Sequence, residues 1–141
     1  MKAAVLTEVR NIEVREVDTP AVANNEVLVK LKACGICTLE QRLYTGDMKI
    51  YYPIVPGHEA SGVVVEAGSA VIGEYKPGAR VAVDLVTRCG ECYYCRTGQS
   101  NMCSNRFRKG QRVLGGFGEY IAVRGSQIYP IPDSIDRKSV V

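Results

Sequence analysis

Four of the chain's six cysteines lie close together, at positions 89, 92, 95 and 103. Their spacing, Cys-x2-Cys-x2-Cys-x7-Cys, lets pairs of thiolates converge on one ion while a fourth completes a tetrahedron. Four protein ligands leave no position for water or substrate, so such a zinc site is structural and stabilises a segment with little apolar surface. The segment at about residues 88–104 is polar and lacks a strand or helix pattern, so we expect a loop lobe held by Cys89, Cys92, Cys95 and Cys103.

Two other interpretations of these thiols stay open. An iron–sulfur cluster also begins with Cys-x2-Cys-x2-Cys, but its motif continues with a gap of three and Cys-Pro, whereas here the gap is seven and Ser104 follows Cys103. Disulfides or free thiols are the other possibility. The N-terminus has no export signal, so we expect a reducing cytosol, where clustered cysteines bind metal more often than they pair. The spacing favours zinc.

A second group of residues has the chemistry of a catalytic metal site. Cys37 ends the sequence CGIC, and His58, the chain's one histidine, precedes Glu59 in PGHEASG. A thiolate, an imidazole and a carboxylate form a zinc site with one open position, where the metal can polarise a carbonyl or lower the pKa of an alcohol. A lone histidine is more often a packed or hydrogen-bonded residue, so spacing alone only suggests this site.

The elements that must position these side chains are mostly short strands. Residues 2–8 and 12–17 predict a hairpin that turns at Arg10 and Asn11. Residues 26–35 alternate, which indicates a strand with one buried face. That face is Val27, Val29, Leu31 and Ala33, and the opposite face carries Lys30 and Lys32. Further strands are predicted at residues 61–68, 76–86, 118–124 and 127–132.

Two helices are predicted. One runs from Thr38 to Tyr44 and is ended by Gly46. The other begins near the C-terminus, where Asp133 or Ser134 can cap it and Asp136 lies in the first turn. It has no stop signal before the chain ends, so we expect a piece of a longer protein. Many short strands with 14 glycines and 6 prolines favour a mainly β, barrel-like domain.

Composition and charge exclude several classes of function. The net charge of +3 is too small to indicate a nucleic-acid or membrane partner, and no apolar run is long enough to span a bilayer. The basic stretch at residues 105–112 is better explained as a solvated loop than as a nucleic-acid patch. Tyr51 and Tyr52 are equally compatible with a substrate cleft and with packing.

Taken together and in this order, the two cysteine groups resemble the zinc-dependent medium-chain dehydrogenases, the family of alcohol, sorbitol and threonine dehydrogenases. CGIC with its short helix, YTGD, PIVPGHEASGVVVEAG, YKPGARVAV, the four-cysteine lobe, GGFGEYIAV and IPD follow that family's order over nearly the whole chain. The resemblance implies a GroES-like fold, a partly open β-barrel with a short helix and a zinc-binding loop lobe. Residues 1–141 would form its catalytic domain.

The resemblance also gives each site residue a role. Cys37 and His58 match the catalytic zinc ligands, and Glu59 matches the adjacent acid that lies near the metal. The structural zinc ligands are matched by Cys89, Cys92, Cys95 and Cys103. Cys34 matches no ligand, so we interpret it as a packed residue at a strand end.

The sequence departs from the family at the usual proton relay. The residue two after the zinc-binding cysteine normally carries a hydroxyl, but here it is Leu39, and Glu40 replaces the usual Asp. Thr38 has a hydroxyl, but on a helix it points about 100° away from Leu39. We therefore expect proton release through bound water or Glu59, and a pocket that Leu39 narrows.

The sequence also lacks the family's cofactor domain. No G-x-G-x-x-G turn joins a strand to a helix, and GGFGEY lacks the last glycine and precedes a strand. In the family, that domain and a third zinc ligand, Cys or Glu, follow this region. We therefore expect a loaded structural site, a catalytic site that is empty, partly loaded or filled by an accidental ligand, and an inactive chain.

The resemblance thus predicts part of a cytoplasmic, homo-oligomeric NAD(P)-dependent dehydrogenase. It would oxidise a secondary alcohol, a polyol or a related hydroxy compound, or reduce the carbonyl, with NAD or NADP bound by the missing domain. The alternative is a non-catalytic, zinc-stabilised GroES-like module that contacts other proteins.

Overall fold

The computed structural model describes residues 1–73, 75–85, 88–105 and 115–141, which form two antiparallel sheets and several short helices. The strands are β1 (Lys2–Glu8), β2 (Asn11–Glu16), β3 (Glu26–Cys34), β4 (Glu59–Ala67), β5 (Arg80–Asp84), β6 (Tyr120–Arg124) and β7 (Ile128–Pro130). The helices are α1 (Thr38–Thr45), α2 (Tyr93–Arg96) and the 3-10 helices η1 (Ser100–Met102), η2 (Gly125–Gln127) and η3 (Arg137–Val140). Every strand in the predicted set is present.

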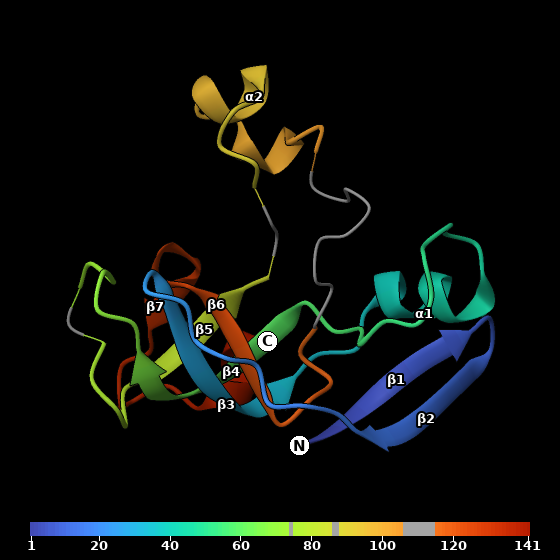
Figure 1. The fold of residues 1–141 in the computed structure, drawn as a ribbon, viewed down its shortest axis with the longest axis horizontal. Coiled ribbons are helices and arrows are strands. Elements are labelled where there is room, and N and C mark those ends of the chain that lie inside the picture. Colours follow the sequence, from blue (N-terminus) through green and yellow to red (C-terminus); the bar gives the residue numbers. More distant parts are fainter. Residues whose placement is uncertain (74, 86–87, 106–114) are drawn as a thin grey trace.

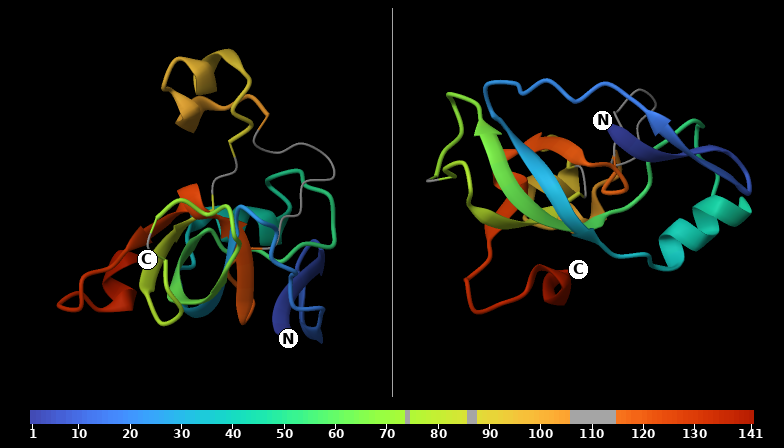
Figure 2. Two further views of the ribbon diagram at one scale, coloured as in Figure 1. Left: turned by 60° about the vertical axis from the view of Figure 1, so that its left-hand side comes forward. Right: turned by 90° about the horizontal axis from the view of Figure 1, so that it is seen from below.

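The larger sheet has the strand order β6-β3-β4-β5-β7 and curls around a core of valine and isoleucine side chains (Figures 1 and 2). Val27 and Val29 of β3 are fully buried in this core, while Lys30 points to solvent, as the alternation predicts. Among the described residues, β6 and β7 do not pair with each other, so the sheet stays open between them. The mainly β, partly open barrel is confirmed.

The hairpin of β1 and β2 is joined to the rest of the molecule through β1. Leu6 and Ile54 exchange backbone hydrogen bonds of 2.8 and 3.0 Å, and Ala3 bridges Gly118. The hairpin turns one residue earlier than predicted, at Val9 and Arg10, because Asn11 already belongs to β2, and Arg10 adopts a left-handed φ of 62°. Leu6 then packs with Leu43 of α1, so this small core fastens the hairpin to the helix.

Helix α1 ends within one residue of its predicted C-terminus, and local chemistry explains both of its ends. Cys37 is the N-cap and Glu40 completes a capping box, in which each side chain accepts a backbone N–H from the other end of the turn. Gly46 ends the helix with φ of 83°, a conformation that costs glycine little. The helix therefore begins at a predicted metal ligand.

The four-cysteine segment stands away from the sheets as a separate lobe (Figures 1 and 2). Its expected loop is partly wrong, because the lobe contains α2 and η1, which contact each other. Within residues 88–105, Cys103 is the one buried residue. The turns form around the sulfur atoms rather than around an apolar core, which explains why hydrophobic periodicity missed them.

The predicted C-terminal helix is also corrected. It begins later, as the 3-10 turn η3, and Asp136 is its N-cap residue instead of lying inside the first turn. The buried hydroxyl of Ser61 on β4 donates a 2.9 Å hydrogen bond to the carbonyl of Arg137, which ties η3 to the sheet. The basic residues at 106–112 lie outside the described residues, so their loop stays a prediction. In the described part of the chain, the helices are all too short to cross a bilayer.

Candidate metal centres

The pairing of β3 with β4 brings the predicted catalytic ligands together. Cys34 at the end of β3 pairs with Ala60 at the start of β4, and the Gly35 N–H donates a 2.7 Å hydrogen bond to the Glu59 carbonyl. Cys37 follows β3 and His58 precedes β4, so their side chains meet at one end of the sheet. The Cys37 Sγ and His58 Nε2 atoms are 3.6 Å apart.

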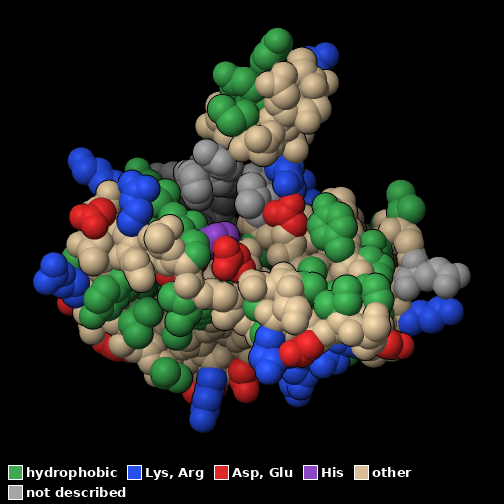
Figure 3. Space-filling model, turned by 180° about the vertical axis from the view of Figure 1, so that it is seen from behind, with side chains coloured by type: hydrophobic (Ala, Val, Ile, Leu, Met, Phe, Trp, Pro, Cys, Tyr) green, Lys and Arg blue, Asp and Glu red, His purple; other side chains and the backbone are tan. Residues whose placement is uncertain are grey.

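The three residues fit a zinc ion. Ligand atoms of Cys37, His58 and Glu59 all lie within 4.8 Å of one another. A tetrahedral zinc with ordinary bond lengths would hold a sulfur and a nitrogen about 3.6 Å apart, which is the separation found for Cys37 and His58. Glu59 lies farther from the other two ligand atoms than they lie from each other, since its Oε1 is 3.9 Å from His58 Nε2. Figure 3 shows the histidine side chain reaching the surface beneath the lobe, next to a carboxylate.

Glu40 organises this site, although its sequence position did not identify it as a site residue. Its side chain is only 6% exposed. One oxygen accepts a 3.0 Å hydrogen bond from the Cys37 backbone N–H, and the other accepts a 2.8 Å hydrogen bond from Nδ1 of His58. Because Nδ1 donates to the carboxylate, the lone pair of Nε2 is free for a metal. The spacing C-x-x-E is the sequence feature that could have identified Glu40, because it is the spacing of a capping box.

The charge on Glu40 is maintained against burial. Burial alone favours the neutral acid, but hydrogen bonds from the Cys37 backbone and from His58 outweigh it, so the pKa of Glu40 lies below its ordinary value. The carboxylate is therefore ionised at neutral pH and acts only as an acceptor. This fixes the direction of both hydrogen bonds.

Leu39 has a packing role as well as a place beside the site. Its backbone N–H donates to Cys37 Sγ at 3.2 Å, and its side chain packs against the small core of Leu6, Leu43 and Ile54. Thr38 is exposed. Whether Leu39 narrows a substrate pocket stays a prediction.

Cys34 lies at the end of β3 and packs against the main core, as predicted. A Cβ atom on Gly116 would stand 2.6 Å from its sulfur, so glycine is required there. Burial, with the nearby charges of Glu40 and Glu59, raises the pKa of the Cys34 thiol to about 11. This thiol is protonated at neutral pH and lies outside the ligand set.

The lobe brings four sulfur atoms together. The Sγ atoms of Cys89, Cys92, Cys95 and Cys103 all lie within 4.8 Å of one another, and those of Cys89 and Cys95 are 4.0 Å apart. Zinc–sulfur bonds of about 2.3 Å in a tetrahedron separate sulfurs by about 3.8 Å. All six cysteines of the chain are unpaired in the structure, so no disulfide forms in place of the metal site.

Backbone N–H groups point at the lobe sulfurs. The Cys89 N–H donates to Cys103 Sγ and the Cys92 N–H to Cys89 Sγ, both at 3.4 Å. Hydrogen bonds from the backbones of Cys95 and Ser104 lower the pKa of Cys92 to about 6, whereas burial raises that of Cys95 to about 11. A thiolate is thus present before any metal binds.

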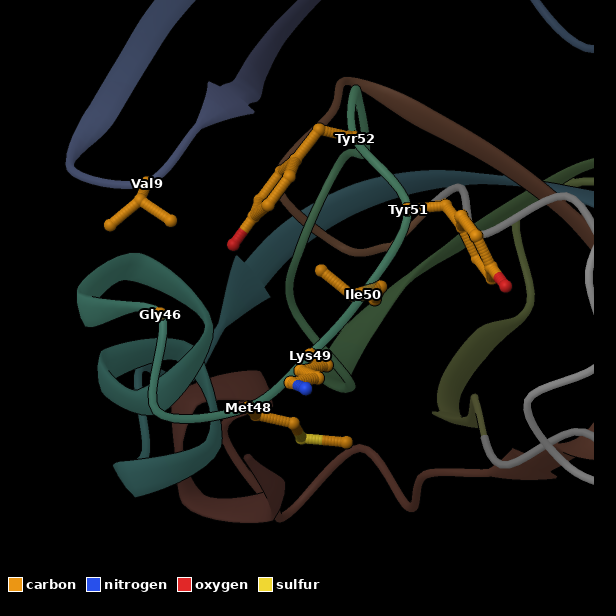
Figure 4. Close-up of a pocket in the computed structure, with 7 residues that line it drawn as sticks. All are labelled: Val9, Gly46, Met48, Lys49, Ile50, Tyr51 and Tyr52. Carbon is orange, nitrogen blue, oxygen red and sulfur yellow. The ribbon is translucent and has the colours of Figure 1, made fainter.

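A pocket of about 460 Å³ lies beside the C-terminal end of α1, where Gly46 contributes to its lining (Figure 4). It is lined by Val9, Gly46, Met48, Lys49, Ile50, Tyr51 and Tyr52. Tyr52 is mainly a packing residue, because it packs against the small core and its hydroxyl donates to the Leu43 carbonyl at 3.0 Å. Tyr51 is 68% exposed.

Residues 23–133 match the family described as the alcohol dehydrogenase GroES-like domain. This chain belongs to that family. An alcohol dehydrogenase of Geobacillus stearothermophilus is 41% identical over 140 residues, which cover 96% of this chain and 41% of that protein. Sorbitol dehydrogenase of Bacillus subtilis is 36% identical over 140 residues, which cover 96% of this chain and 39% of that protein.

Solved structures in the family have the same fold. A protein of Sinorhizobium meliloti, described as a zinc-binding dehydrogenase and bound to NADP, superposes with a TM-score of 0.87 at 42% identity, covering 97% of this chain and 40% of that one. Galactitol-1-phosphate dehydrogenase of Escherichia coli gives 0.86 at 31% identity, covering 99% and 40%. The chain therefore spans about two fifths of the length of these relatives. The resemblance to zinc-dependent alcohol and polyol dehydrogenases is confirmed.

Proposed function

We propose that this GroES-like chain is the substrate-activating domain of a zinc-dependent NAD(P) dehydrogenase that interconverts a secondary alcohol or polyol and its carbonyl compound. The relatives include alcohol, sorbitol and threonine dehydrogenases. NAD or NADP would bind to the part of the relatives that residues 1–141 do not match, which is about three fifths of their length.

The observation that carries the proposal is the placement of Cys37 and His58, with their ligand atoms 3.6 Å apart at an exposed end of the sheet. A zinc ion bound there would polarise the substrate oxygen and lower the pKa of an alcohol. Glu40 holds His58 in the tautomer that presents Nε2. The position two after Cys37 is Leu39, so no hydroxyl stands there to take the proton. The proton would leave through bound water or through Glu59, which is partly exposed beside His58.

The test is a chimeric enzyme. The chain would be joined to the part of the Geobacillus stearothermophilus alcohol dehydrogenase that it does not match, loaded with zinc, and assayed for reduction of NAD or NADP with a panel of secondary alcohols and polyols. We expect turnover that falls at least about 100-fold in Cys37→Ser and His58→Ala. Cys34→Ser, three residues from Cys37 but outside the ligand set, is the matched control and keeps activity.

If the chimera does not fold, a second measurement on the chain itself tests the proposal. Cobalt replaces zinc in such sites, and its visible spectrum reports ligand changes. In the cobalt-loaded chain, a secondary alcohol should shift the bands that disappear in His58→Ala, while the bands of the lobe stay unchanged. A folded, metal-loaded chimera without turnover, together with no spectral shift, would overturn the proposal and favour the non-catalytic module.

A further inference from the structure

Among the described residues, no strand pairs with the outer edge of β2. β1 lies between β2 and the body of the molecule, and β2 is at the periphery (Figure 1). The Ala4 and Leu6 N–H groups of β1 donate away from β2, to Phe117 and Ile54, each at 2.8 Å. Their opposite residues on β2, Val14 and Ile12, are therefore the pairs that do not hydrogen-bond across the hairpin.

The backbone N–H and C=O groups of β2 therefore point alternately toward β1 and away from it. Val17 and Met1 exchange hydrogen bonds of 2.9 and 2.7 Å across the hairpin. Counting back by two, Arg15 and Glu13 also face β1, whereas the N–H and C=O groups of Ile12, Val14 and Glu16 face outward. Among described residues, no backbone partner is recorded for these outward N–H groups.

The side chains at this edge combine an exposed apolar stripe with charges. Val14 is 74% exposed and Ile12 is 45% exposed. Charged side chains usually protect an edge strand from pairing, but charges of opposite sign can also match those of a partner strand. Here the charges alternate in sign around Val14, with Glu13 on one side and Arg15 on the other.

This order makes the strand complementary to itself. In an antiparallel pair centred on Val14, the two Val14 residues are opposite each other, and Glu13 of each copy is opposite Arg15 of the other. Because Val14 faces outward, its N–H and C=O form the central pair of hydrogen bonds, and the two charged pairs occupy the closer, non-hydrogen-bonded positions. Opposite charges at such positions stabilise a sheet.

We propose that β2 pairs with β2 of a second copy of this chain about a two-fold axis at Val14, joining the two hairpins into one four-stranded sheet. The partner is the chain itself because the register that aligns the outward backbone groups also aligns Glu13 with Arg15. An isologous contact of this kind closes at two copies. Its contact is short, so the dimer forms weakly. This surface is independent of the proposed reaction.

The test uses the zinc-loaded chain in sedimentation equilibrium, from about 10 μM to about 1 mM, where small interfaces associate. The wild-type mass should rise toward twice that of the chain. Glu13→Arg places Arg opposite Arg, and Arg15→Glu places Glu opposite Glu, so each weakens association at least tenfold. Glu66→Arg, an exposed site on β4, changes the charge equally and should leave association unchanged.

Mixing the two single variants tests whether association depends on the pairing of Glu13 with Arg15 across the two-fold axis. A Glu13→Arg chain offers two arginines and an Arg15→Glu chain two glutamates, so the mixture should form the mixed dimer that neither variant forms alone. Both variants also lose the exposed ion pair of 2.8 Å within β2, which mixing cannot restore. A wild type that stays monomeric, single variants that associate like wild type, or a mixture without association would each overturn the proposal.

Discussion

At the scale of single residues, one carboxylate links the helix to the metal centre. Glu40 accepts the Cys37 backbone N–H and His58 Nδ1 with its two oxygens, so it holds the residues that provide the thiolate and the imidazole. Hydrogen-bonded partners of metal ligands fix ring orientation and tautomer, and they commonly matter nearly as much as the ligands. In the proposed site, Glu40 is therefore a positioning residue, and Glu59 lies beside the other two candidate ligands.

Replacing Glu40 with Gln should weaken zinc binding at Cys37 and His58 roughly 10- to 100-fold, because the amide no longer provides a charged acceptor to both donors. Competition with a chromophoric chelator measures this affinity. Glu66→Gln, on the exposed part of β4, is the matched control, and the lobe site should keep its affinity in both variants. Equal affinities for wild type and Glu40→Gln would show that Glu40 does not position the site.

Glu40 also predicts a pH dependence. Since its pKa is lowered in the folded chain, its hydrogen bonds contribute stability above the unfolded pKa of about 4.3, and this contribution is lost as pH falls through the lower folded pKa. Urea unfolding of metal-free chain between pH 7 and pH 3 should show a smaller loss in Glu40→Gln than in wild type. Parallel curves would contradict the assignment.

The Cys34 thiol should be poorly reactive in the metal-free chain. With a pKa of about 11, only about one molecule in a thousand is a thiolate at pH 8. Its alkylation rate should keep rising up to pH 9.5, whereas an ordinary thiol levels off near pH 9. Mass spectrometry of iodoacetamide-treated protein locates the label, and an early plateau would exclude the raised pKa.

At the scale of elements, the two ends of α1 contact different parts of the molecule. Its N-terminus begins at a metal ligand, and its C-terminus is fastened to the hairpin, because Gly46 lies against Val9. The 460 Å³ pocket lies at this C-terminal end, where both Gly46 and Val9 line it. The lobe is the opposite case, since it has turns but almost no buried apolar surface.

Gly46→Ala should destabilise the chain by about 1–2 kcal/mol from the left-handed conformation alone, with an added cost from crowding Val9. A Cβ atom there would lie 3.0 Å from Val9 Cγ2. Gly78→Ala is the matched control, because Gly78 also has a positive φ, of 93°, but nothing within 4 Å. Equal losses in urea unfolding would mean that Val9 moves aside freely.

Removing one lobe ligand should unfold the lobe without unfolding the sheets. Cys95→Ser leaves three thiolates, and a segment with a single buried residue cannot keep its turns without a metal. Hydrogen exchange should become fast in residues 88–105 and stay slow in β3 and β4. Fast exchange throughout the chain would show that the lobe supports the main core.

At the scale of the whole molecule, the two centres differ in completeness. The lobe offers four sulfur ligands, whereas the other centre offers Cys37, His58 and the looser Glu59. Both centres lie on a fold whose sheets form the rigid frame. The relatives named above are more than twice as long as this chain. The proposed dimer forms through β2, which belongs to the two-stranded sheet, whereas Cys37 and His58 lie at one end of the five-stranded sheet and the four cysteines lie in the separate lobe.

The purified chain should therefore hold about one tightly bound zinc and a second one more weakly. A mild chelator should first remove the zinc bound by Cys37 and His58, and His58→Ala should lack this fast phase. Elemental analysis also distinguishes zinc from iron in the lobe. Two zinc ions that leave equally slowly would contradict the incomplete second site.

The sequence by itself predicted the strands, helix α1 and the four-cysteine lobe, because alternation, capping residues and cysteine spacing are local patterns. The partly open β-barrel and the ligand roles of Cys37, His58 and Glu59 were predicted from the family resemblance, since spacing alone only suggests the second site. The sequence missed α2, η1 and the start of η3, since thiols and a hydrogen bond from Ser61 hold them instead of apolar periodicity. Only the tertiary structure decided how Glu40 and the outer edge of β2 are used. Those roles depend on which strands become neighbours, and residues far apart in the chain set that.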